Sequence, residues 1–202
     1  MAGKLVSSFA WDLAGRVGSQ LAGAVIGIIL ARLLSPSEFG LIGMAMVFIG
    51  ISGIFTNLGL SSALVQRTAP TEEHYSSSFY LNIAASLVLT ILFILLAPAI
   101  ARFFKNEALT DIVRVLSISL LISGFTVVQE ARIRKQMRFD LLTKARIISS
   151  VTSGGVGVAM AFTGFGVWSL VAQTLLGRVI TTGYYWVISD WKPKLLFRLK
   201  AL

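Results

Sequence analysis

The sequence contains no cysteine and few charged residues. Its 202 residues include one histidine and nine acidic side chains. The absence of cysteine excludes disulfide bonds and thiolate metal sites, but it leaves the redox compartment open. Charged residues make up 13% of the chain, about half the share in an ordinary soluble domain. A water-soluble protein is therefore not expected.

The single histidine gives no sign of catalysis. His74 lies beside Glu72 and Glu73 in a polar stretch, where it is expected to occupy a solvated turn. The chain has no nucleophile elbow, phosphate-binding loop or HExxH pattern, and no expected outward loop is long enough to form an enzymatic site. We therefore expect no enzymatic activity, no metal site and no cofactor.

Apolar residues form 55% of the chain, and the mean hydropathy is +0.81. A bilayer core about 30 Å thick needs about 20 apolar residues per helix, so this length allows about six crossings. Barrel strands are excluded because the apolar runs are about twice as long as such strands. The expected fold class is an all-α polytopic membrane protein with six transmembrane helices, at 9–31, 41–65, 78–100, 112–131, 145–164 and 167–188.

Lysine and arginine residues between these segments set the expected orientation. Six of them lie in 132–146, which is the longest expected connection. The connections on one side carry twelve cations: Lys4, Arg67, Arg132, Arg134, Lys135, Arg138, Lys144, Arg146, Lys192, Lys194, Arg198 and Lys200. The other side carries only Arg32, Arg102 and Lys105. The positive-inside rule therefore places both termini in the cytoplasm. This topology explains the net charge of +9 without a nucleic-acid partner.

The chain divides into two expected parts. Residues 1–190 form the six-helix lobe, which lies among membrane lipids. Residues 191–202, WKPKLLFRLKAL, are basic and amphipathic. They are expected to be either a cytoplasmic tail or the truncated connector to a further lobe.

Polar residues recur every fourth position in several segments, which places them on one helix face. Ser78, Asn82, Ser86 and Thr90 form one such stripe, and Ser169, Gln173, Gly177 and Thr181 form another. Close helix packing is the favoured interpretation for the small residues. A water-filled cavity is the alternative, and the larger amides are its better candidates because they are costly to bury. The polar cavity candidates are Gln20, Asn57, Asn82 and Gln173.

Two arginines lie at membrane depth, where each costs about 2.5 to 3.5 kcal/mol at a helix centre. Arg16 has Asp12 one turn away, so an ion pair within the helix competes equally with a ligand role. Arg178 has no acid within a turn, so its partner must lie on another helix or be a ligand. Both are candidate substrate-binding residues, with Asp12 as a charge partner.

Four stretches together resemble one family. They are ARLLSPSEFGLIGMAMVFIG at 31–50, FTNLGLSSALVQR at 55–67, QEARIRKQMRFD at 129–140 and GFGVWSLVAQ at 164–173. The chain resembles Wzx-type polysaccharide flippases of the multidrug/oligosaccharidyl-lipid/polysaccharide exporter superfamily, specifically their N-terminal lobe. The resemblance implies a two-lobed fold in the bacterial cytoplasmic membrane.

The function implied is transport of undecaprenyl-pyrophosphate-linked oligosaccharide from the inner to the outer leaflet, for O-antigen, capsule or exopolysaccharide synthesis. Family flippases use cationic cavities for such anionic substrates. This chain has one lobe's worth of helices, so a missing C-terminal lobe or a second copy is an expected partner. A cation-coupled drug antiporter of the same fold and a non-catalytic scaffold for glycan assembly are the alternatives.

Overall fold

The structure is a computed structural model that describes residues 2–57, 64, 71–194 and 196, with the side chains of 2–16 and 54–57 outside the description. The described part contains helices and connections but no strand. The helices are α1 (Ala2–Leu33), α2 (Pro36–Asn57), α4 (Glu72–Phe103), α5 (Ala108–Gly124), α6 (Val127–Lys135), α7 (Phe139–Phe162) and α8 (Val167–Ile188). The all-α prediction is confirmed for these residues.

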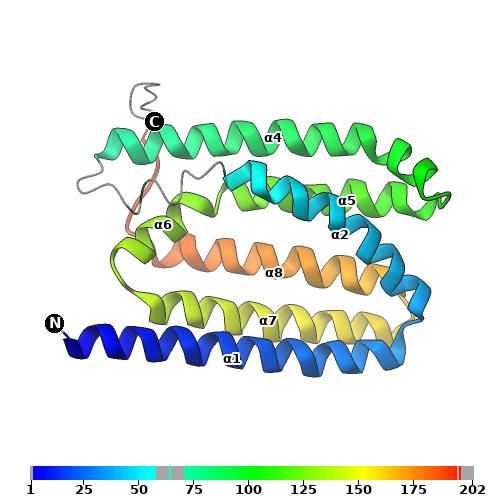
Figure 1. The fold of residues 1–202 in the computed structure, drawn as a ribbon, viewed down its shortest axis with the longest axis horizontal. Helices are drawn as coiled ribbons and strands as arrows, with labels where there is room; N and C mark the ends of the chain where they lie inside the picture. The colour runs from blue at the N-terminus through cyan, green and yellow to red at the C-terminus, as the bar shows by residue number, and fades with distance from the viewer. Residues whose placement is uncertain (1, 58–63, 65–70, 195, 197–202) are drawn as a thin grey trace.

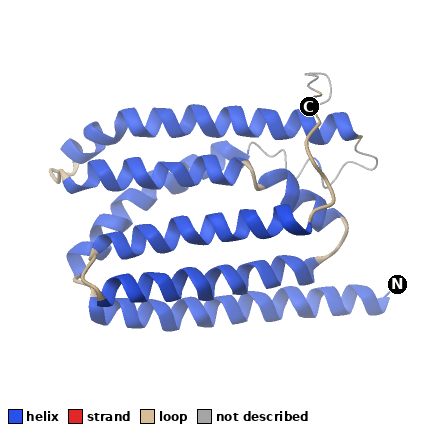
Figure 2. Cartoon of the chain, turned by 180° about the vertical axis from the view of Figure 1, so that it is seen from behind, coloured by secondary structure: helices blue, strands red, loops and turns tan. Residues whose placement is uncertain are grey.

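Five helices stand side by side in one row, in the order α4, α5, α8, α7 and α1 (Figure 1). Helix α2 crosses one face of this row and packs mainly on α5. Helix α1 begins and α8 ends at the same end of the row, and the view from behind shows the short connections gathered at its two ends (Figure 2). This arrangement is that of helical hairpins joined by short turns.

Three helical segments are long and apolar enough to cross a membrane: Pro36–Gly53 of α2, all of α4 and all of α7. Helices α5 and α6, bent by 41° at the break between them, would together form a fourth span. The described apolar part of α1 is Val17–Leu33. The structure thus supports several spans, and six crossings remain a prediction.

Two expectations about the second half of the chain are wrong. The segment 112–131 is not one helix, because α5 ends at Gly124 and α6 begins at Val127. The stretch 132–146 is not a long loop either, since only residues 136–138 separate α6 from α7. The helices extend beyond their apolar segments because charged side chains can stay in water while the backbone remains hydrogen-bonded.

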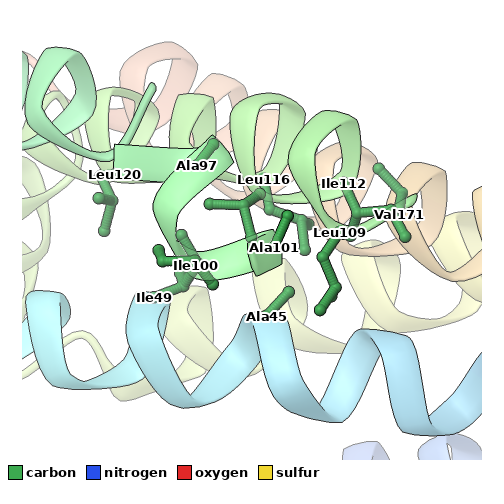
Figure 3. Close-up of a cluster of buried hydrophobic side chains, with 11 residues drawn as sticks. Ala45, Ile49, Ala97, Ile100, Ala101, Leu109, Ile112, Leu116, Leu120 and Val171 are labelled. Carbon is green, nitrogen blue, oxygen red and sulfur yellow. The ribbon is translucent and has the colours of Figure 1, made fainter. Parts of the chain in front are cut away.

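The largest apolar cluster joins α2, α4, α5 and α8 near one end of the row (Figure 3). Ala45 of α2 and Ala97 of α4 are fully buried there against Leu116 of α5. Other large apolar side chains point outward, including Leu95 at 71% and Leu21 at 62% exposure. Such exposed apolar faces are what helices present to lipid.

The polar stripe of α4 packs between helices. Ser78, Asn82, Ser86 and Thr90 are all buried. Thr90 Oγ1 donates to the Ser86 carbonyl at 2.8 Å and lies 3.2 Å from the Ser117 carbonyl of α5. A Cβ at Gly124 of α5 would collide with Ser86, so the small residue allows the close approach. Helix packing accounts for this stripe.

The segment after α8 docks on the end of the row. Trp191 is 3% exposed, and its Nε1 donates to Glu72 Oε2 of α4 at 3.0 Å. Glu72 also lies 3.7 Å from Arg132 of α6 and 4.0 Å from Lys194 Nζ. The Arg132 guanidinium stacks over the Tyr75 ring at 4.8 Å. Residues 191–194 are therefore held against α4 and α6.

Candidate functional site

The polar stripe of α8 borders a groove between α7 and α8. The groove has a volume of about 440 Å³ and is lined by Ser149, Ser153, Gln173, Thr174, Gly177, Arg178 and Thr181. Ser149 Oγ donates to the Gly177 carbonyl at 2.7 Å, which fixes the two helices at this point. A Cβ at Gly157 would lie 3.0 Å from Gln173 Cβ, so the backbones approach closely. We call this the α7–α8 groove.

A second groove, with a volume of about 270 Å³, also has Arg178 in its wall. Its wall combines α2, α5, α6 and α8: Met46, Ile49, Gly50, Gly53, Ser119, Leu120, Ser123, Thr126, Val127, Glu130 and Arg178. We call it the α5–α6 groove, because the break between these helices forms part of its wall. Arg178 lines both grooves.

Arg178 occupies the middle of α8, eleven residues after Val167 and ten before Ile188. It is exposed within this chain, and no carboxylate among the described residues lies within 4 Å of its guanidinium. Glu130, in the same groove, instead pairs with Arg134, whose Nε lies 3.0 Å from the carboxylate. An arginine without an acidic partner beside hydroxyl groups can bind an anion in a planar fork.

The other predicted site residues do not gather at these grooves. Asn82 is fully buried, with Nδ2 donating to the Ser78 carbonyl at 2.9 Å, and lines neither groove. Gln20 is exposed on α1 and lines neither groove. The side chains of Asp12, Arg16 and Asn57 lie outside the described residues. Of the predicted set, the structure brings together Arg178 and Gln173.

Several groove residues were not predicted from the sequence. Ser149 and Ser153 of α7 lie four residues apart, as do Ser119 and Ser123 of α5. The four-residue spacing that identified the polar stripes of α4 and α8 would have identified these serine pairs as well. Glu130 lines the same groove as Arg178, although nothing in the sequence links the two residues.

Comparison with known proteins identifies the family. The family described as polysaccharide biosynthesis protein matches residues 29–202. The chain belongs to this family. The match confirms the resemblance to Wzx-type polysaccharide flippases and the prediction of a multi-pass protein of the bacterial inner membrane.

The chain spans less than two fifths of the length of the curated relatives described here. It is 26% identical over 192 residues to the succinoglycan biosynthesis transport protein ExoT of Rhizobium meliloti, covering 95% of the chain and 39% of ExoT. It is 30% identical over 151 residues to the teichuronic acid biosynthesis protein TuaB of Bacillus subtilis, covering 74% and 31%. It is 20% identical over 195 residues to the lipopolysaccharide biosynthesis protein WzxC of Escherichia coli, covering 96% and 39%. No solved structure matches the chain.

Proposed function

We propose that the complete protein is a flippase without enzymatic activity. It moves undecaprenyl-pyrophosphate-linked oligosaccharide from the inner to the outer leaflet, and this chain forms its N-terminal half. The supporting observation is Arg178, which lines two grooves from the middle of α8 and has no acidic partner among the described residues. The pyrophosphate is the ligand that this guanidinium would bind.

The energetics of Arg178 support a cavity rather than a lipid-facing surface. An arginine at the centre of a helix costs about 2.5 to 3.5 kcal/mol in lipid even on the most lenient scales. The cost falls if the residue faces water or an anionic ligand. The side of the grooves left open by this chain would then be closed by a second six-helix lobe or a second copy, with the substrate between the two.

The test uses the complete gene in a strain that lacks its flippase. Arg178→Ala is expected to abolish surface glycan at unchanged membrane abundance, and Arg178→Lys is expected to restore part of it, because lysine keeps the charge but loses the fork. Arg114→Ala is the matched control, since Arg114 lies near the start of α5, pairs with Asp111 at 3.6 Å and lines neither groove. Normal export by the Arg178→Ala protein would refute the proposal.

A cation-coupled antiporter is the second candidate, because Glu130 contributes a carboxylate to the α5–α6 groove. Such coupling requires the acid to exchange a proton or cation during transport. Glu130→Gln would then abolish transport driven by an ion gradient, whereas a pyrophosphate site on Arg178 would retain binding in this variant.

A further inference from the structure

The break between α5 and α6 involves only small departures from helical backbone geometry. Phe125 has φ −71° and ψ −16°, and Thr126 has φ −91° and ψ −33°, so both residues are close to helical geometry. No proline lies at the break, although a serine–glycine pair, Ser123 and Gly124, precedes it. Small dihedral changes would therefore be enough to convert the bent pair into a continuous helix.

Two side chains of α8 hold the bent form. Trp186 Nε1 donates to the Phe125 carbonyl at 3.0 Å, an acceptor that would bind the Gln129 N–H in a continuous helix. Thr182 Oγ1 lies 2.6 Å from Thr126 Oγ1, which also bonds the Ile122 carbonyl at 3.1 Å. The break is thus hydrogen-bonded from a neighbouring helix at two successive residues.

These two residues share one face of α8 with the arginine of the grooves. Arg178, Thr182 and Trp186 are spaced by four residues, so they follow one another along that face. The α5–α6 groove takes Ser119 and Ser123 from before the break and Thr126 and Glu130 from after it. The bend therefore sets how these groups stand around Arg178.

We infer that Thr182 and Trp186 are positioning residues: they hold α5 and α6 bent and so assemble the anion site at Arg178. The identity of the ligand in this inference rests on the proposed function, whereas the statement that α8 holds the bend does not. Loss of the two hydrogen bonds lets α6 swing toward a straight helix, which withdraws the Thr126 hydroxyl, a group that can donate to an anion, from the groove.

The first test measures the bend. Trp186→Phe removes the indole N–H but keeps an aromatic ring beside Phe79, whose ring centroid lies 5.8 Å from that of Trp186. Thr182→Val removes the hydroxyl and keeps the shape of the side chain. Spin labels on Met137 and Leu87, both exposed, report the position of the end of α6 relative to α4. The 202 residues contain no cysteine, so this part of the complete protein needs no background replacement.

The double variant Thr182→Val, Trp186→Phe is expected to shift the distance between the two spin labels, or to add a second population of distances. A nine-residue helix spans about 13 Å, so closing a 41° bend moves its far end by about 9 Å. Trp168→Phe is the matched control, because Trp168 lies on α8 eighteen residues from Trp186 and is 39% exposed. Distances identical to wild type in the double variant would overturn the inference.

The second test measures binding of farnesyl pyrophosphate to the purified complete protein. The double variant is expected to bind about tenfold more weakly while eluting as a single species, whereas the Trp168→Phe control binds normally. A shifted bend with unchanged affinity would refute the positioning role. If the wild type binds no pyrophosphate, the proposed function fails and the positioning role fails with it, while the label distances still decide whether α8 holds the bend.

Discussion

The Glu38 carboxylate, at the start of α2, lies directly against Gly166 in the turn before α8. It accepts hydrogen bonds from the Ser35 N–H at 2.6 Å and the Ser35 hydroxyl at 2.8 Å, and also from the Val167 N–H. A Cβ at Gly166 would collide with this carboxylate. Two stretches that carry the family resemblance, SPSEFG and GFG, therefore meet at one end of the bundle.

We predict that Gly166→Ala destabilises the protein more than Gly164→Ala. Both glycines have positive φ, +82° at Gly164 and +55° at Gly166, so alanine adds backbone strain at each. The strain is larger at Gly166, whose ψ of −132° lies outside the left-handed helical region that other residues can adopt. Only Gly166 also faces Glu38, whereas nothing lies within 4 Å of a Cβ at Gly164. Thermal unfolding of the complete protein in detergent measures the difference.

The double variant Glu38→Ala, Gly166→Ala separates strain from collision. Removing the carboxylate should relieve part of the Gly166→Ala cost, giving a favourable coupling between the two changes. Strictly additive losses would show that the collision contributes nothing.

Reporter fusions test the topology. Fusions after Lys4, Arg67, Arg138 and Lys200 are expected to report cytoplasm, because twelve of the fifteen connecting cations lie on that side. Fusions after Ser37, Asn106 and Gly164 are expected to report the outside. In the structure Asn106 and Gly164 lie in connections and Ser37 lies in the first turn of α2, all at one end of the helix row. A cytoplasmic signal after Asn106 would overturn the six-crossing topology.

Adjacent glycines on α7 are expected to respond in opposite directions to alanine. A Cβ at Gly154 would collide with the Ile26 side chain of α1, so Gly154→Ala should cost about 1 to 3 kcal/mol through overpacking. Gly155 faces open space, and Gly155→Ala should be neutral or stabilising by up to about 1 kcal/mol. Unfolding midpoints compare the two, and Ile26→Ala should rescue Gly154→Ala. Equal midpoints for both single variants would contradict a tight α1–α7 contact.

Glu72 variants test how the segment after α8 is held. Glu72→Gln should cost no more than about 1 kcal/mol, because its ion pairs with Arg132 and Lys194 are partly exposed and glutamine still accepts from Trp191 Nε1. Glu72→Ala leaves that buried donor without its acceptor and should cost about 1 to 3 kcal/mol. Trypsin cleavage after Lys194 should accelerate in the alanine variant, whereas Pro193 blocks cleavage after Lys192. Glu107→Gln, in the connection before α5, is the control, and equal cleavage of all variants would argue against this role.

The sequence predicted the helical fold because the thickness of the bilayer sets how many consecutive apolar residues a crossing helix needs. The segment 167–188 coincides with α8, where a glycine turn and Ser189 limit the apolar run. The Ser123–Gly124 pair is a local signal for a bend. The hydrogen bond that Trp186 donates to the Phe125 carbonyl could not be predicted, because the two residues are sixty-one positions apart. Periodicity likewise placed Asn82 and Gln173 on helix faces without showing which face opens into a groove. The packing of α4 on α5 buries Asn82, whereas Gln173 lines the groove that α8 forms with α7.

The docking of Trp191 has an optical consequence. Trp186 and Trp191 both lie edge-on to Phe79, with ring centroids 5.8 Å away, while Trp168 is partly exposed on α8. A buried indole emits at shorter wavelength than a solvated one, so two of the chain's four tryptophans report on the same end of the helix row. A red shift of their emission would signal departure of residues 191–194 from α4, without any introduced label.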